Sequence, residues 1–214
     1  RAAPAVKDYA KKHPHSMGVW STSSKSHVAH MSAGDFYASE VSASMQQDDA
    51  LSIEFVAAAG KSTVLASNVA VSQGEIVDAA FMSKKALCDF YAEQIAGTED
   101  GVLFSLHLKA TMMKVSDPII FGHAVKAYYK DAFVKHAKLF EQLGVDANNG
   151  IGDAYEKIKS LAADQQAAVK ADLDACFAAG PDMAMVDSDR GISNLHVPSD
   201  IIVDASMPAA IRES

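Results

Sequence analysis

Two lysines near the middle of the chain could take part in acid–base or anion chemistry. Lys109 directly follows the apolar segment 102–108, and Lys114 lies a few residues further on. Functional side chains of open α/β sheets gather at the carboxyl ends of strands, and a lysine desolvated by apolar neighbours can act as a general base. Two alternatives stay open for Lys109: it is such a base, or it is a solvated lysine at a strand end. Lys114 could bind an anion or balance Asp117.

Two carboxylates near the end of the chain could hold a metal ion. Asp200 and Asp204 are spaced by one helical turn, so both can lie on one face of a helix. Paired carboxylates suit a hard divalent cation such as Mg²⁺ or Mn²⁺. The intervening residues 201–203 are apolar, and an unpaired charge beside them would be costly. The alternative is a helix-end charge at Asp200 and a salt bridge at Asp204.

The segment 14–35 is rich in histidine, serine and glycine and is predicted to be a loop. His27 and His30 could bind zinc, but zinc needs further ligands, and the sequence has no H-E-x-x-H or C-x-x-C motif. We keep a zinc hydrolase as a remote alternative. The serines around Lys25 could hold an anion, although a solvated polar loop explains them equally well. The glycine pair in 150–152 is only a weak sign of a nucleotide loop, because G-x-G-x-x-G needs a third glycine.

The elements that must position these residues alternate between helix and strand, which favours an α/β protein. The helical pattern covers residues 4–12, 84–96 after the N-cap Ser83, 117–144 and 153–179, and a last helix follows Ser199. Continuous apolar strands are predicted over 102–108 and 183–186. Alternating apolar residues on both sides of a Gly-Lys turn predict a β-hairpin over about 51–71.

The composition excludes several classes of protein. At roughly 100–200 residues per domain, 214 residues make one domain or two small ones. An apolar content of 49% is ordinary for a globular chain, and no apolar run reaches the roughly 18 residues of a membrane span. A net charge of −8 argues against nucleic acid as a partner. Cys88 and Cys176 are predicted to be buried free thiols in a reducing compartment, which indicates a cytoplasmic protein.

Several long motifs are together similar to those of one family. They are H-P-H-S-M-G (13–18), S-K-S-H-V-A-H-M (24–31), G-D-F-Y (34–37), H-L-K-A-T-M-M-K-V-S-D-P-I-I-F-G (107–122), N-N-G-I-G-D (148–153), S-D-R-G-I-S-N-L-H-V-P-S-D (188–200) and I-I-V-D-A-S-M-P-A-A-I-R (201–212). In these stretches the chain resembles the monomeric NADP-dependent isocitrate dehydrogenases of bacteria.

The resemblance implies oxidative decarboxylation of isocitrate to 2-oxoglutarate, a reaction of the tricarboxylic acid cycle, with NADP and Mg²⁺ or Mn²⁺. It implies that Lys109 takes part in proton transfer, that Asp204 binds the metal and that Arg1 binds a substrate carboxylate. The implied fold is of the isocitrate/isopropylmalate dehydrogenase type, which binds NADP without a Rossmann loop. We expect a mixed sheet flanked by helices with the added hairpin. No cofactor-binding residue can be assigned in this chain.

Members of this family are several times longer than 214 residues. We therefore expect residues 1–214 to be part of the large central domain of a longer enzyme, with the hairpin as an insertion. The partner would be the remainder of the parent polypeptide, and the isolated chain would be inactive. The alternative is a non-catalytic fragment that binds a metal, a carboxylate or another chain.

Overall fold

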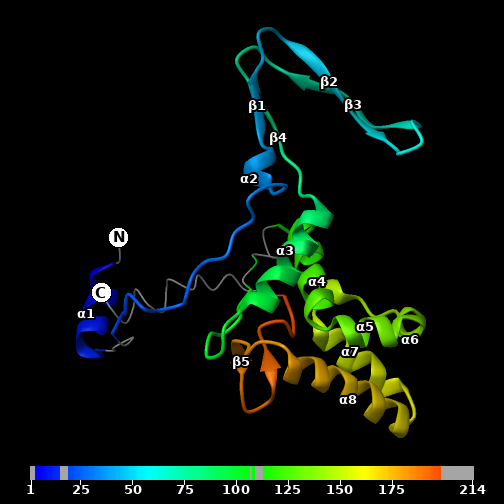
Figure 1. Ribbon diagram of the computed structural model, residues 1–214. Helices are drawn as coiled ribbons and strands as arrows, with labels where there is room; N and C mark the ends of the chain where they lie inside the picture. Colours follow the sequence, from blue (N-terminus) through cyan, green and yellow to red (C-terminus); the bar gives the residue numbers. More distant parts are fainter. Residues whose placement is uncertain (1–2, 15–18, 107, 109–112, 199–214) are drawn as a thin grey trace. The chain divides into compact units, whose positions relative to one another are not determined.

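The structure is a computed structural model that describes residues 3–14, 19–106, 108 and 113–198 (Figure 1). It divides into two compact units, one formed by His30–Leu87 and the other by Arg1–Ala29 together with Cys88–Ser214. Both units contain helices and strands, which confirms the predicted α/β composition. Within the described residues, no helix combines the length and the apolar character needed to cross a bilayer.

The unit His30–Leu87 consists of two antiparallel strand pairs and one short helix. Strand β1 (Val41–Ser44) pairs with β4 (Ile76–Ala79), and β2 (Asp49–Val56) pairs with β3 (Ser62–Val71). The second pair forms a two-stranded ribbon where the alternating sequence predicts one (Figure 1). The β1–β4 pair was not predicted, because its strands are short and their partners lie far apart in the sequence. That the ribbon is an insertion stays a prediction.

The short helix α2 (Phe36–Ser39) begins after Asp35. The Asp35 Oδ1 accepts the backbone N–H of Ala38 at 3.1 Å, which satisfies one of the free donors at the start of the helix. Gly34 precedes this cap with a φ of +77°. A Cβ at Gly34 would also lie 3.0 Å from the Cβ of Ala86, so a side chain there would be strained by the backbone conformation and would crowd Ala86.

The second unit is mainly helical. Its helices are α1 (Pro4–Lys12), α3 (Lys84–Gly97, whose first turn lies in the other unit), α4 (Ser116–Tyr128), α5 (Lys130–Lys135), α6 (Ala137–Leu143), α7 (Ile151–Lys157) and α8 (Ala163–Ala179). Two 3₁₀ turns cover Ala147–Asn149 and Ile158–Ser160, and the strands β5 (Met185–Asp187) and β6 (Ile192–Ser193) pair antiparallel. The Ser83 Oγ accepts the N–H of Ala86 at 3.3 Å, as its predicted role as N-cap of α3 requires.

The prediction of one continuous helix over 117–144 is wrong. Three helices cover this range, and they are separated at Tyr129 (φ −97°, ψ 30°) and His136 (φ −103°, ψ 18°). Tertiary contacts explain both breaks: Tyr129 is almost fully buried, and the His136 Nε2 lies 2.6 Å from the Asp172 Oδ2 on α8. The predicted end is correct, because Gly144 follows α6 in the left-handed conformation.

We expected a mixed sheet flanked by helices, but the described residues do not form one continuous sheet. Their strands form three two-stranded antiparallel sheets, and one isolated parallel bridge joins Phe104 to Met183. The two apolar segments predicted as strands therefore meet, although only at this bridge. An apolar segment forms an extended strand only where adjacent segments supply backbone hydrogen-bond partners along its length. Among the described residues, the segments around Phe104 and Met183 pair at this single bridge.

The core lies among α4, α5, α7 and α8. Its largest fully buried side chains are Tyr129, Ile151, Leu173, Leu195, Val125 and Val169. Cys88 and Cys176 are free thiols as predicted, but both are only half-buried. The helices place them beside the core and not inside it.

Candidate functional site

Four of the residues with predicted roles in chemistry lie outside the described residues. This holds for Lys109, Asp204, Arg1 and Asp200. The structure does describe the segments that lead to two of them, residues 102–106 before Lys109 and residues 188–198 before Asp204. The geometry of these two segments is therefore the part of the candidate site that the structure defines.

The segment before Lys109 is held by hydrogen bonds at alternate residues. The backbone N–H of Phe104 donates to the carbonyl of Asp182 at 2.7 Å, and the N–H of Ala184 donates to the carbonyl of Phe104 at 2.9 Å. Two residues further on, the N–H of Leu106 donates to the side-chain Oδ1 of Asn194 at 2.5 Å. Asn194 is held in turn, because its own N–H donates to the carbonyl of Ala184 at 2.9 Å. The two segments that lead to the predicted site residues are thus joined directly.

The glycines of the N-N-G-I-G-D motif pack against the backbone of the segment before Asp204. The N–H of Ile151 donates to the carbonyl of Leu195 at 3.0 Å, and that of Gly152 donates to the carbonyl of His196 at 2.8 Å. A Cβ at Gly150 would lie 2.2 Å from the same His196 oxygen, and Gly150 also has a φ of +86°. These glycines therefore serve a close backbone approach, and the weak sign of a nucleotide loop has this structural explanation.

The side chain of His196 lies over α7. Its ring stacks on that of Tyr155 with 6.1 Å between centroids and 12° between planes. Burial, followed by the charge of Arg190, lowers the pKa of the His196 imidazole below its ordinary value. Burial also raises the pKa of Tyr155 to about 12, and the nearby charge of Asp174 acts in the same direction. Both rings are therefore neutral near pH 7 and pack as apolar surfaces.

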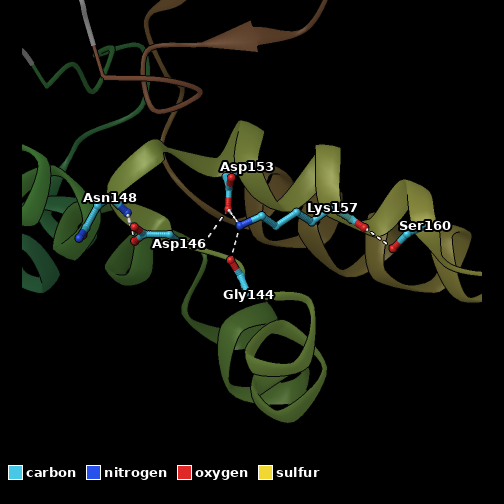
Figure 2. A network of polar contacts seen from close by, with 6 residues as sticks. All are labelled: Gly144, Asp146, Asn148, Asp153, Lys157 and Ser160. Atoms are coloured by element: carbon cyan, nitrogen blue, oxygen red, sulfur yellow. Dashed lines mark hydrogen bonds and ion pairs between the residues drawn. The ribbon is translucent and has the colours of Figure 1, made fainter.

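A polar network braces the corner that carries these glycines (Figure 2). The Asp146 Oδ1 accepts the N–H of Asn148 at 2.9 Å, and the N–H of Asp146 donates to the Asp153 Oδ2 at 2.7 Å. The Lys157 ammonium lies 3.0 Å from the same Asp153 oxygen and also donates to the carbonyl of Gly144. The Asp153 carboxylate on α7 thereby binds the corner directly at Asp146, and through Lys157 it is connected to Gly144 at the end of α6.

The motif 107–122 contacts the same corner through its last residue, Gly122. Gly122 on α4 is buried, and a Cβ at this position would lie 2.1 Å from the Asn148 Oδ1. Asp117, in the first turn of α4, is buried too, and the Ser116 hydroxyl donates to its Oδ1 at 3.3 Å. Lys114 is exposed. The described parts of the three motif stretches 107–122, 148–153 and 188–200 therefore converge around the 147–152 corner.

The histidines of the loop do not form a cluster in the described part of the chain. The Nδ1 of His27 lies 2.9 Å from the carbonyl of Lys25, and the Nδ1 of His30 lies 3.3 Å from the carbonyl of Met31. Among the described residues, no group of three or more His, Cys, Asp or Glu is placed to hold a metal ion.

A helical core with small sheets, in which the described parts of three long motifs pack together, defines a mixed α/β protein. The sequence pattern described as monomeric isocitrate dehydrogenase matches residues 1–214, so the chain belongs to that family. It is 60% identical over 215 residues to isocitrate dehydrogenase [NADP] 2 of Colwellia maris. It is 58% identical over 213 residues to the enzyme of the same name from Mycobacterium tuberculosis, and 56% identical over 215 residues to isocitrate dehydrogenase [NADP] of Azotobacter vinelandii.

These matches cover 99–100% of this chain but only 29% of each relative. The chain therefore corresponds to less than a third of the length of these relatives. Sequence reasoning did not single out Asn194 or His196. Both belong to a motif that the resemblance identifies, but no spacing rule connects an asparagine with a backbone N–H 88 positions away. Only the folded chain shows this contact.

Proposed function

We propose that this chain is the part of an NADP-dependent isocitrate dehydrogenase that supplies a proton-transferring lysine and a metal-binding carboxylate. The observation that carries the proposal is the match of the family pattern to all of residues 1–214, together with relatives named as NADP isocitrate dehydrogenases. The reaction is the oxidative decarboxylation of isocitrate to 2-oxoglutarate, with hydride transfer to NADP. The residues that bind NADP are assigned to the parent polypeptide beyond this chain.

Lys109 is the proposed proton-transferring group. The oxidation removes a proton from the substrate hydroxyl, and a neutral amine within hydrogen-bond reach can accept it. Fixed backbone before the lysine supports this role, because a general base must be placed to within a fraction of an ångström. That fixed backbone is present at Phe104 and Leu106.

Asp204 is the proposed metal ligand. A carboxylate oxygen fits a hard cation such as Mg²⁺ or Mn²⁺, and Mg²⁺ is commonly held by one or two protein carboxylates together with substrate oxygens. When bound, the cation would supply positive charge beside the substrate oxygens. The family resemblance assigns the other protein ligands to the remaining polypeptide.

Arg1 is the proposed contact to a substrate carboxylate. A guanidinium presents two parallel N–H donors, which match the two oxygens of a carboxylate. Isocitrate carries three carboxylates, and each of them is a possible partner for a guanidinium.

The direct test is Lys109→Met in the full-length enzyme. We expect kcat to fall by about 10²-fold or more, because the proton acceptor is lost, while the dissociation constant of isocitrate changes little. The measurement is isocitrate-dependent NADPH formation combined with calorimetric binding of isocitrate. The matched control is Lys126→Met, which removes an exposed lysine from helix α4 and should leave kcat unchanged. Unchanged turnover of Lys109→Met would contradict the proposal.

The metal role has its own test in Asp204→Asn. This change keeps the shape of the side chain and removes its charge. We expect the Mg²⁺ concentration for half-maximal activity to rise by about tenfold or more, with the loss partly overcome at high Mg²⁺. An unchanged Mg²⁺ dependence would remove Asp204 from the metal site.

A further inference from the structure

The β2–β3 ribbon is too exposed to be stable without a partner (Figure 1). Every residue of its two strands is exposed, apart from the half-buried Leu51 and Ala66 and the buried Val71. Among the described residues, β2 and β3 pair only with each other. An isolated two-stranded ribbon is marginally stable at best in water, and it gains stability from a third strand or from a helix packed on it.

We propose that the outer edge of β2 receives a further strand from the remaining polypeptide of the full-length enzyme. This addition would turn the ribbon into a three-stranded sheet. The inference does not depend on the proposed roles of Lys109, Asp204 or Arg1, because it rests only on the backbone of the unit His30–Leu87.

The hydrogen bonds at the two ends of β2 show which of its backbone groups face outward. The N–H of Ala57, directly after β2, donates across the ribbon to the carbonyl of Lys61 at 2.9 Å. In an antiparallel pair every second residue directs both its N–H and its carbonyl to the partner strand, so the odd-numbered residues of β2 face β3. The N–H of Ala50 fits this alternation, because it donates to the Asp49 Oδ1 at 2.8 Å.

The outward-facing residues of β2 are therefore the even-numbered ones. Beyond Ala50 these are Ser52, Glu54 and Val56, and each directs an N–H and a carbonyl to the outer edge. Such a row of backbone groups is a template for pairing with another strand. This edge is the part of the ribbon that can bind a strand through a regular series of hydrogen bonds.

The outer edge of β3 is less suited to this role. The register of the ribbon shifts between Leu51 and Ile53 and again between Ile53 and Glu54, and at each shift β3 contains one residue more than β2. Asn68, within the first shift, has a φ of +56°. Extra residues of this kind bend and twist the strand that contains them and interrupt its pairing, which protects an edge against a further strand.

The edge of β2 lacks these protections. Its sequence, D-A-L-S-I-E-F-V, contains no proline and no lysine, and the extra residues at the register shifts are all on β3. The charged side chain of Glu54 is held across the ribbon, because its Oε2 accepts the hydroxyl of Ser62 at 2.9 Å. The two strands therefore differ, and the difference favours β2 as the site of strand addition.

The size of the relatives indicates where the added strand comes from. They are more than three times as long as this chain, and the family is described as monomeric. A strand from the same polypeptide therefore fits better than a strand from a second copy. Ile53 and Phe55 are 53% and 56% exposed, so the segment that brings this strand would also cover apolar surface.

The test is hydrogen–deuterium exchange in the full-length enzyme, measured at single residues. We expect the N–H groups of Ser52, Glu54 and Val56 to exchange at least about 10²-fold more slowly than in an unfolded chain, because strand hydrogen bonds limit exchange to openings of the sheet. Ser62 lies opposite Val56, so its N–H faces the outer edge of β3; it is the internal control and should exchange rapidly. Exchange of the three β2 groups as fast as that of Ser62 would overturn the proposal.

Ser52→Pro distinguishes an added strand from any other covering. Proline removes an outward N–H and leaves the groups that face β3 in place, and an edge strand tolerates it only where that N–H faces solvent. We expect exchange at Glu54 and Val56 to become about tenfold faster or more, because proline interrupts the pairing with the added strand. Protection that Ser52→Pro leaves unchanged would indicate a covering helix or loop and would overturn the proposal.

Ser62→Pro is the matched control. It places proline at the first residue of β3, on the edge where no strand is proposed, and exchange at Glu54 and Val56 should stay within about threefold of the wild-type rate. Equal effects of the two prolines would overturn the proposal. Should Ser52→Pro fail to fold, the exchange pattern of the wild-type enzyme still decides.

Dilution of the full-length enzyme identifies the source of the strand. We expect a monomer in sedimentation at every concentration, with the slow exchange at Ser52, Glu54 and Val56 unchanged, because an intramolecular strand does not dissociate on dilution. A dimer whose protection falls on dilution would assign the strand to a second copy and would overturn the proposal.

Discussion

Gly150 illustrates how much a single residue contributes to this fold. It has a positive φ, and the carbonyl of His196 occupies the space where a Cβ would lie. The sequence alone identifies the G-I-G motif but cannot show what approaches it, because the approaching backbone is more than 40 positions away. The proposed roles of Lys109, Asp204 and Arg1 come from motif resemblance, whereas the packing role of Gly150 and the contact made by Asn194 follow only from tertiary structure.

Gly150→Ala should destabilise the protein strongly. We expect the free energy of unfolding to fall by about 3 kcal/mol, from a strained φ and a collision with backbone that cannot rotate away. Gly144→Ala is the matched control, because Gly144 also has a positive φ, of +66°, but has nothing within 4 Å of the added Cβ. Its cost should be about 1 kcal/mol. Urea unfolding of both variants is the measurement, and equal losses would contradict the contact with His196.

His196 should make stability depend on pH in the weakly acidic range. The pKa of the folded imidazole is below its ordinary value of 6.5, so the unfolded chain takes up a proton more readily than the folded protein. This residue therefore has no effect on stability above that value and lowers the free energy of unfolding as pH falls below it. His196→Phe keeps an aromatic ring against Tyr155 without titrating. Urea midpoints from about pH 7.5 to about pH 5 should fall less steeply in this variant than in the wild type; parallel curves would contradict the account.

At the scale of elements, the sequence predicts helix ends well, because capping residues act on the backbone of their own helix. Pro4, Ser83 and Gly144 mark helix ends, and all three lie at or beside the ends that the structure shows. The continuous helix over 117–144 fails because its breaks depend on partners elsewhere, such as Asp172 on α8 for His136. Propensity does not contain this information, since tertiary contacts override it.

The β2–β3 ribbon is the element whose role depends most on what lies beyond the chain. Leu51, Ile53 and Phe55 alternate along β2 and so share one face, and Ile53 and Phe55 are 53% and 56% exposed. The relatives are more than three times as long as this chain and belong to a family described as monomeric. We therefore expect the remaining polypeptide, and not a second copy, to cover this face.

Phe55→Ser tests this expectation. In the full-length enzyme the variant should lose about 2 kcal/mol of stability, the value of burying a large apolar side chain. In the isolated chain the loss should be under about 0.5 kcal/mol, because the side chain stays largely exposed there. Val64→Ser, which lies opposite Glu54 on the other face of the ribbon, is the control and should cost little in both forms. Equal losses for Phe55→Ser in the two forms would contradict a covering by the remaining polypeptide.

At the scale of the whole molecule, the proposed active centre is divided between two stretches of polypeptide. In this proposal the chain supplies Lys109, Asp204 and Arg1, and the described parts of three motifs pack together in the segments that lead to the first two. The NADP-binding residues and the further metal ligands are assigned to the remaining length of the enzyme. From the sequence, this division can be inferred only through the resemblance to the isocitrate dehydrogenase family. Composition and periodicity by themselves indicate only an α/β protein.

The most direct measurement is the rate of NADPH formation by the purified 214-residue chain with isocitrate, NADP and Mg²⁺, beside the full-length enzyme. We predict turnover by the full-length enzyme and none by the chain alone, because the chain holds only part of the centre. The same chain carrying Lys109→Met serves as a control for contaminating enzyme. Turnover by the 214-residue chain that disappears in this control would show a complete active centre within the chain and would contradict the account.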